Sequence, residues 1–251
     1  MNLPRFYCNA DLQTGATIEL ADELAHYMTR VLRLKDGSAV WLFNGVGGQF
    51  LASLQQQSKK VSAVIGTFHD VECELAGKVT VAQGLASGDK MDWIIEKCTE
   101  IGVTTVAPIA ARYSVLQLSG ERLQKRLAHW QKVARSASEQ CGRNRINQVM
   151  APQSLAAYLS TVDASAPQET RIVFCDPDAD HDLDSALAGL TPAHDIHLIL
   201  LIGPEGGWSE EEKAQAIQAG AYSMRFGSRI LRTETAAIAL VSAASARLGW
   251  L

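Results

Sequence analysis

The chain has 251 residues, 47% of them hydrophobic and 20% charged, with a formal net charge of −4 at pH 7, as expected for a globular protein of one large or two modest domains. Its apolar runs are too short to span a membrane, and Met1 to Tyr7 lack the apolar core of a signal peptide. Its five cysteines contain no CxxC pair and indicate neither a disulfide framework nor a zinc site. We therefore expect a cytoplasmic protein with no membrane partner and no metal.

The charges are unevenly distributed along the chain. Eight Lys or Arg residues and two acids lie between Arg112 and Arg145, whereas twelve acids and one base lie between Asp163 and Glu212. Because binding follows the local potential more than the net charge, this asymmetry indicates one basic working surface of the kind that binds nucleic acid.

Residues 1–72 predict a small β-barrel domain. Helical spacing of apolar residues predicts a helix over 21–34, and strands are expected over 39–43, 50–54 and 61–68. The glycine-rich stretch 44–48 is typical of a hairpin loop. These features alone leave RNA binding open.

After a linker at 71–77, the pattern changes to alternating strands and helices. A strand over 78–86, a helix from Met91 to Ile101 ending at Gly102, and a strand over 103–109 form a βαβ unit. Such a unit predicts a parallel sheet.

A long helix is predicted from Ser119 to Cys141, with one apolar and one basic face. The basic face carries Lys125, His129, Lys132 and Arg135. The helix ends in Glu139-Gln140-Cys141-Gly142-Arg143-Asn144-Arg145, where two arginines could hold a phosphate or a base edge.

The acidic stretch 176–182 is interpreted as an exposed loop. It lacks the glycine and the terminal glutamate of a calcium loop. The six histidines show no ligand spacing, and no GxSxG elbow is present.

The most informative stretch is the run from Leu198 to Ile202, which predicts a strand buried on both faces. A loop with three glycines and a proline follows, and then Ser209 with Glu212 at the capping-box position of a helix. Ligands bind at such strand ends in α/β sheets. Since Glu205 and the acidic helix start disfavour a phosphate, a neutral or cationic ligand is expected. A tight connection without a ligand is the alternative.

A second polar loop precedes the last helix. It follows a strand predicted over 222–226 and spans 227–235, and the helix after it is rich in alanine. Two such loops could hold one ligand between them, and the small side chains permit close packing in the core or against a second subunit.

The two loops resemble a known family. Residues 202–207 (Ile-Gly-Pro-Glu-Gly-Gly) and 229–236 (Arg-Ile-Leu-Arg-Thr-Glu-Thr-Ala) look like those of the bacterial small-subunit ribosomal RNA uridine-N3 methyltransferases of the SPOUT superfamily. Further segments match the same family: Arg5 to Tyr7, His26 to Arg33, Lys97 to Val103 and Glu139 to Arg143. The likeness covers essentially the whole chain, and these motifs in order are specific.

The resemblance implies an α/β fold in which a PUA-like β-barrel that binds RNA, residues 1–72, precedes a SPOUT-type parallel sheet with a deep trefoil knot, residues 73–251. It implies S-adenosylmethionine as cofactor, a homodimer, and methylation of a uridine in the decoding region of 16S rRNA, free or in the assembled 30S particle. The cofactor-binding residues it implies are Leu201, Ile202, Gly203, Pro204, Glu205, Gly206, Gly207, Phe226, Gly227, Ile230, Leu231, Arg232, Thr233 and Thr235. The RNA-binding residues expected are Arg5, Arg30, Arg33, Lys125, Lys132, Arg135 and Arg145.

The implied reaction requires removal of the uridine N3 proton or stabilisation of the uracil anion, because uridine N3–H is a weak acid. Glu139 or Glu205 could accept the proton, and Arg143 or Arg232 could stabilise the uracil anion. The target base must be unpaired or flipped.

The chain departs from the family at Ser87, at Ile146-Asn147 and at Phe226. The first departure could weaken an RNA or cofactor contact. Another SPOUT RNA methyltransferase, acting on ribose or tRNA, and a non-catalytic RNA-binding protein are the alternative functions.

Overall fold

The computed structural model describes residues 3–57, 60–162, 169–191 and 195–251. The chain divides into two compact units, and each is described by itself. The N-terminal unit comprises Met1–Glu74 and Ser138–Ile146, and the C-terminal unit comprises Leu75–Ala137 and Asn147–Leu251. Among the described helices, none is long and apolar enough to cross a membrane.

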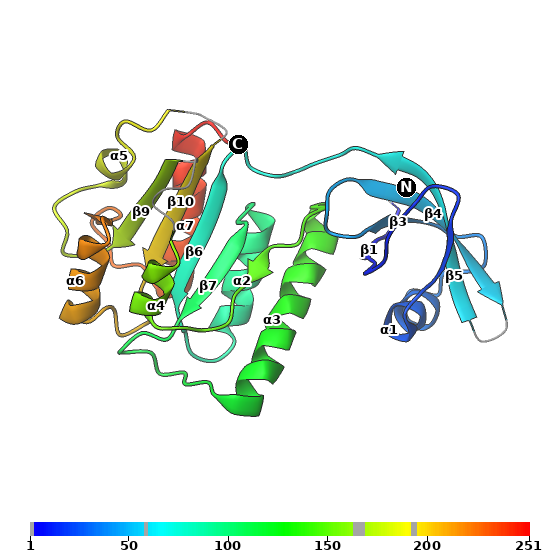
Figure 1. Cartoon of the computed structure of the whole chain (residues 1–251), viewed down its shortest axis with the longest axis horizontal. Coiled ribbons are helices and arrows are strands. Elements are labelled where there is room, and N and C mark those ends of the chain that lie inside the picture. Colours follow the sequence, from blue (N-terminus) through cyan, green and yellow to red (C-terminus); the bar gives the residue numbers. More distant parts are fainter. Residues whose placement is uncertain (1–2, 58–59, 163–168, 192–194) are drawn as a thin grey trace. The chain divides into compact units, whose positions relative to one another are not determined.

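The N-terminal unit contains a five-stranded sheet in the order β1-β3-β4-β5-β2 (Figure 1). Its strands are β1 (Arg5–Tyr7), β2 (Thr17–Glu19), β3 (Ala39–Phe43), β4 (Gln49–Gln57) and β5 (Lys60–His69). β1 pairs with β3 in parallel, and the other pairs are antiparallel. Alternate residues such as Val40 and Leu42 enter one hydrophobic core, which is the period expected of strands with one buried face.

The helix predicted over 21–34 is shorter than expected and changes its winding. α1 (Asp22–His26) continues as a wider turn, η1 (Tyr27–Val31), in which the Leu32 N–H donates to the Tyr27 carbonyl over 3.0 Å. Arg33 then adopts a positive φ of 55°, which ends the helix. Met28 is fully buried and anchors this segment in the core.

The C-terminal unit is built on a six-stranded parallel sheet in the order β11-β9-β10-β6-β7-β8. Its strands are β6 (Lys78–Gly84), β7 (Thr105–Ile109), β8 (Gln148–Val149), β9 (Glu169–Cys175), β10 (Ile196–Ile202) and β11 (Tyr222–Met224). β10 lies between β9 and β6, and Leu198 to Ile202 are almost fully buried. The predicted parallel sheet and its buried strand are therefore confirmed.

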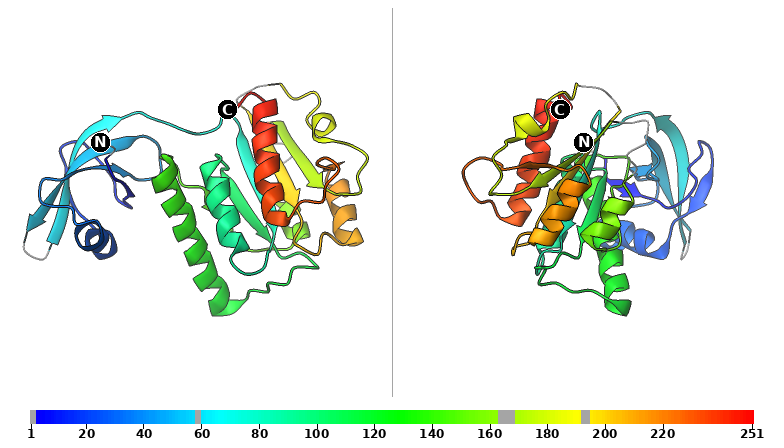
Figure 2. Two further views of the ribbon diagram at one scale, coloured as in Figure 1. Left: turned by 180° about the vertical axis from the view of Figure 1, so that it is seen from behind. Right: turned by 60° about the vertical axis from the view of Figure 1, so that its left-hand side comes forward.

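Helices cover both faces of this sheet (Figures 1 and 2). One face carries α2 (Lys90–Glu100) and α7 (Thr233–Arg247), which lie side by side, and the other carries α4 (Leu155–Ser160) and α6 (Glu210–Gln218). The short helix α5 (Leu183–Ala186) contacts β11. Because both faces are covered, β10 has a continuous apolar sequence instead of an alternating one.

The long helix α3 (Gly120–Cys141) agrees closely with its prediction. Trp130 and Ala134 are buried on the predicted apolar face, and Lys125, Lys132 and Arg135 are exposed on the other. The elements from β8 to α5 were not predicted, since each is short and none has a long apolar period. The knot implied by the resemblance stays a prediction.

Candidate active site

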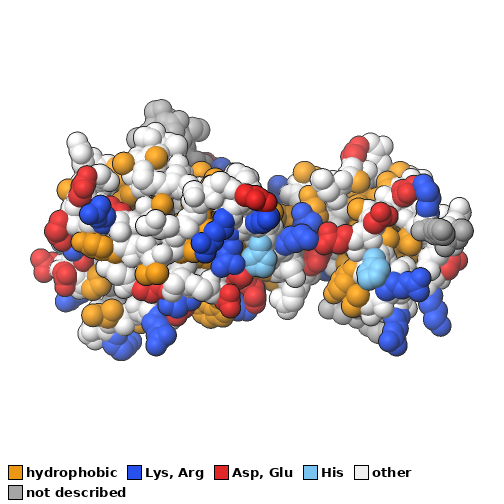
Figure 3. All heavy atoms as spheres, turned by 90° about the horizontal axis from the view of Figure 1, so that it is seen from below, with side chains coloured by type: hydrophobic (Ala, Val, Ile, Leu, Met, Phe, Trp, Pro, Cys, Tyr) orange, Lys and Arg blue, Asp and Glu red, His pale blue; other side chains and the backbone are white. Residues whose placement is uncertain are grey.

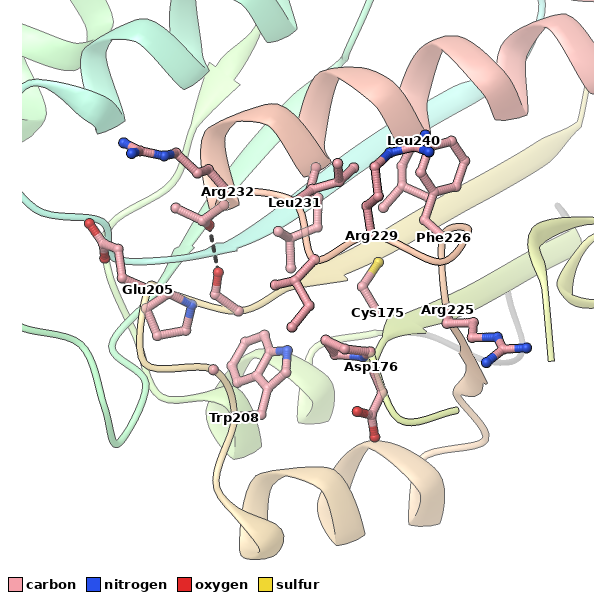
Figure 4. A pocket seen from close by; sticks show the side chains of 18 of the residues that line it. Cys175, Asp176, Glu205, Trp208, Arg225, Phe226, Arg229, Leu231, Arg232 and Leu240 are labelled. Carbon is pink, nitrogen blue, oxygen red and sulfur yellow. Dashed lines mark hydrogen bonds between the residues drawn. The ribbon is translucent and has the colours of Figure 1, made fainter. Parts of the chain in front are cut away.

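A cavity of about 660 Å³ lies at the carboxyl ends of β9, β10 and β11 (Figure 4). Three segments form most of its lining: residues 175–178 at the end of β9, residues of the loop 202–208 at the end of β10, and residues 224–233 from the end of β11 to the start of α7. Its volume is in the range of small-molecule sites, and its place is the one at which parallel α/β sheets bind ligands.

The cavity is apolar in its middle and charged at its sides. Trp208, Leu231 and Leu240 contribute to the apolar part, and Figure 4 shows the Glu205 and Arg232 side chains at one side with Arg225 opposite them. A ligand with an apolar body and at least one polar end fits this lining.

The glycine loop is held by a tight turn. The Gly207 N–H donates to the Pro204 carbonyl over 2.9 Å, and Gly207 has a φ of +72°, which favours glycine. Beneath this turn, a Cβ placed on Gly84 would lie 2.4 Å from the backbone nitrogen of Pro204. Gly84 therefore lets the loop pack directly on the end of β6.

A buried polar network joins the two ligand loops. The Nε2 of Gln83, a fully buried residue, donates to Thr233 Oγ1 over 2.7 Å, and Thr233 Oγ1 donates to the Gly203 carbonyl over 2.5 Å. Thr233 was predicted at the site and Gln83 was not. The amide of Gln83 near the end of the strand 78–84 was the available signal, because buried amides need partners.

Replacing Thr233 by valine is expected to weaken ligand binding about 5- to 30-fold, because Gln83 and Gly203 each lose a hydrogen-bond partner, at a cost of roughly 1–2 kcal/mol. Thr233→Ser keeps the hydroxyl and serves as the matched control. Calorimetric titration of both variants measures the effect. Equal affinities of the valine and serine variants would contradict this role of the network.

Glu205 projects from the loop toward the start of α2. Its Oε1 accepts from Ser87 N–H over 3.1 Å, from Ser87 Oγ over 2.7 Å and from Lys90 Nζ over 2.7 Å. Desolvation favours a higher pKa for Glu205, but the hydrogen bonds from Lys90 and Ser87 outweigh it and lower the pKa to about 2. At Ser87, one of the positions where the chain departs from the family, the side-chain hydroxyl thus donates a hydrogen bond to Glu205.

The capping box predicted at the start of α6 is confirmed. Ser209 Oγ accepts from the Glu212 N–H, and the Glu212 carboxylate accepts from the Ser209 N–H over 2.9 Å. Glu212 is buried and also accepts from the Arg112 N–H over 2.9 Å. Glu205 is therefore ion-paired with Lys90, and the Glu212 carboxylate is held by hydrogen bonds within the protein.

Most residues predicted to bind the cofactor line the cavity. Those that do are Ile202, Gly203, Pro204, Glu205, Gly207, Phe226, Gly227, Ile230, Leu231, Arg232 and Thr233. Leu201, Gly206 and Thr235 are not among the lining residues. Gly206 packs instead on the segment after β7, where a Cβ added to it would lie 2.7 Å from Tyr113 Cβ. Cys175, Lys90 and Trp208 line the cavity and were not predicted.

The four catalytic candidates divide between the two units. Glu205 and Arg232 line the cavity of the C-terminal unit. Glu139 and Arg143 belong to the N-terminal unit, where the Glu139 carboxylate accepts from the Tyr7 N–H over 2.8 Å and the Arg143 guanidinium binds Glu74. Arg143 is buried there.

The predicted RNA-binding residues also differ in their surroundings. Arg5 is engaged within the N-terminal unit, where it stacks on Phe43 and donates to Gln49, to Asn144 and to carbonyls near the end of α3. Exposed side chains are those of Arg30, Arg33, Lys125, Lys132, Arg135 and Arg145. Figure 3 shows several groups of Lys and Arg side chains on one face of the molecule, with Asp and Glu side chains among them.

Comparisons with protein families match both units. A family described as "RNA methyltransferase domain" matches residues 73–245, and one described as "RNA methyltransferase PUA domain" matches residues 20–66.

Individual proteins are similar over nearly the whole chain. The ribosomal RNA small subunit methyltransferase E of Bacillus subtilis (strain 168) is 31% identical over 93% of this chain and 91% of its own length. The enzyme of that name from Neisseria gonorrhoeae, solved bound to S-adenosyl methionine, has a TM-score of 0.87 and 31% identity, with 98% of each chain covered. A putative methyltransferase from Legionella pneumophila, solved with the bound cofactor SAM, has a TM-score of 0.89 and 29% identity, with 98% of each chain covered.

Proposed function

The chain belongs to the RNA methyltransferase family, and from that premise we propose that it uses S-adenosylmethionine to methylate N3 of a uridine in the decoding region of small-subunit ribosomal RNA. The observation that supports this most is the cavity between the loops 202–208 and 224–233, which lies within the matched domain. The relatives named above support the ribosomal substrate.

The residues of the cavity fit this cofactor. Trp208, Leu231 and Leu240 provide apolar surface for an adenosine, and Gly203 and Gly207 let backbone approach it closely. The lining has no lysine-serine pair of a phosphate loop, which agrees with a cofactor that carries a sulfonium and no phosphate. When bound, the cofactor supplies an electrophilic methyl group.

The protein's own task is to make uridine N3 nucleophilic. Arg232 lines the cavity and is exposed, and no hydrogen bond or ion pair joins its guanidinium to another described residue. Its guanidinium would stabilise the negative charge that spreads over the uracil oxygens when N3 loses its proton. A carboxylate with a pKa of about 2 is a weak base, so Glu205 is poorly suited to accept this proton, which would pass to water.

RNA contacts would come from both units. Arg30 and Arg33 on the segment 22–34, in the part matched by the PUA family, and Lys125, Lys132 and Arg135 on α3 are exposed cations that fit a phosphate backbone. We assign residues 1–72 to RNA binding and 73–251 to the methyltransferase domain. A homodimer is proposed from the half-exposed alanines of α7, such as Ala239 and Ala243, which permit close packing of a second subunit.

Labelled cofactor tests the proposal on three substrates: small ribosomal subunits that lack the methylation, free small-subunit rRNA, and tRNA. Label is expected on rRNA, either free or within the subunit, and not on tRNA. Arg232→Ala is expected to lower kcat about 100-fold, because one preorganised stabiliser of the developing anion is lost. Label on tRNA alone would support the alternative of a tRNA methyltransferase. Absence of cofactor binding would support a non-catalytic RNA-binding protein.

A further inference from the structure

The two carboxylate oxygens of Glu205 have different surroundings. Oε1 takes all three hydrogen bonds that Glu205 receives from other described residues, namely from the Ser87 N–H, from the Ser87 hydroxyl and from Lys90. Oε2 receives none from another described residue. The Glu205 and Lys90 side chains are 29% and 32% exposed, and both residues line the cavity. Glu205 thus presents one unused acceptor at the mouth of the cofactor cavity, on the side where Figure 4 shows its side chain.

This acceptor is held in place before any ligand binds. The turn that carries Glu205 is closed by the hydrogen bond from Gly207 to Pro204 and rests on Gly84. Oε1 is tied to two residues, Ser87 and Lys90, at and just before the start of α2. A preorganised group loses little entropy when it binds, so its contribution to affinity is larger.

The other acids that line the cavity are less suited to a cationic ligand. Asp176 Oδ1 accepts from the Asp178 N–H over 3.1 Å, and Asp176 Oδ2 lies 3.2 Å from Lys213 Nζ on α6, so both of its oxygens are engaged. Asp178 is exposed. Glu234 has an Oε2 that is buried within the protein without a partner.

We propose that Glu205 and Lys90 together bind the amino-acid end of the cofactor, with Glu205 Oε2 accepting from the α-ammonium group and Lys90 Nζ donating to the α-carboxylate. The proposal rests on the proposed function. Its basis is charge complementarity: an anionic acceptor and a cationic donor lie next to each other, as do the ammonium and the carboxylate of an α-amino acid. Lys90 donates one of its three ammonium N–H groups to Glu205, so two remain for the α-carboxylate.

The ionisation of Glu205 agrees with this role. Its carboxylate remains charged throughout the physiological pH range, because its pKa is lowered to about 2. A permanently charged acceptor binds an ammonium group well, since charge-assisted hydrogen bonds are about twice as strong as neutral ones. This ionisation suits a binding role for Glu205 better than the role of the base.

Calorimetry with two ligands tests the proposal: S-adenosylhomocysteine, and its deamino analogue, in which the α-ammonium is replaced by hydrogen. Glu205→Gln is expected to weaken S-adenosylhomocysteine about 10- to 100-fold, the usual range for a hydrogen bond to a charged group, and to change the affinity for the deamino analogue less than about 2-fold. Glu211→Gln, at an exposed acid of α6 that does not line the cavity, is the matched control and should leave both affinities unchanged. Thermal melting of each variant establishes that it is folded.

Lys90→Met provides an independent second test. It should weaken S-adenosylhomocysteine by a similar factor and spare its decarboxylated analogue. If Glu205→Gln weakens the binding of S-adenosylhomocysteine and of its deamino analogue equally, or leaves the affinity for S-adenosylhomocysteine unchanged, the inference is overturned and the proposed function stands. Wild-type protein that binds neither S-adenosylhomocysteine nor its analogues would overturn the proposed function and the inference with it.

Discussion

Replacing Gly84 by alanine is expected to weaken cofactor binding at least about 30-fold. The added Cβ would lie 2.4 Å from both N and Cδ of Pro204, which is too close for any real pair of atoms. β6 cannot yield, because Gly84 pairs with Ile109 on the neighbouring strand β7. The turn that carries Glu205 must therefore move out of position. Overpacking of this kind also costs about 1–3 kcal/mol of folding free energy.

Gly220→Ala is the matched control for this prediction. Gly220 follows α6 with a φ of +81° and has open space around its Cβ position, so alanine there is strained by roughly 1–2 kcal/mol without touching the cavity. Both variants should lose stability in urea titrations, and only Gly84→Ala should lose affinity in calorimetry. Normal affinity of Gly84→Ala would contradict the packing of the loop on β6.

Replacing Arg143 by alanine is expected to destabilise the N-terminal unit by about 3–5 kcal/mol. Arg143 and Glu74 form a largely buried ion pair, and the substitution leaves the Glu74 carboxylate without its partner charge. Arg143 Nε donates to Glu74 over 2.9 Å, and the Arg143 side chain is only 3% exposed. Hydrogen exchange of the β3, β4 and β5 amides measures the loss. Every described residue that lines the cofactor cavity belongs to the C-terminal unit, so cofactor affinity should be unchanged while turnover on the small subunit falls.

Arg145→Ala is the control for Arg143. Arg145 is 51% exposed and lies 3.3 Å from Glu72, so its loss should cost less than about 1 kcal/mol. The double variant Arg143→Met with Glu74→Leu should recover much of the stability, since apolar residues of similar volume often replace a buried pair without loss. If Arg143→Ala ends methyl transfer and leaves hydrogen exchange unchanged, Arg143 acts in the chemistry and not in the fold.

The frame of the site could be predicted because it depends on local patterns. The apolar run from Leu198 to Ile202 permits only a strand buried on both faces, and Ser209 with Glu212 forms the capping box that the sequence indicates. The loop between them is thereby fixed at the end of the sheet. The second loop follows from the same logic at the end of β11.

The partners of the individual side chains could not be predicted, because they come from distant parts of the chain. Gln83 meets Thr233 across 150 positions, and Ser87 meets Glu205 across 118. The stretch from Glu139 to Arg145 shows the same limit. Its charges favoured a phosphate site, whereas Arg143 pairs with Glu74 and Glu139 accepts from the backbone of Tyr7. No periodicity or spacing reveals such partners.

The position of the transferred methyl group tests the central claim most directly. Small-subunit rRNA treated with the protein and methyl-labelled S-adenosylmethionine is digested to nucleosides, which are then separated and identified by mass. N3-methyluridine carrying the label is the predicted result. Label recovered on a ribose oxygen, or on any base other than uracil, would contradict the account.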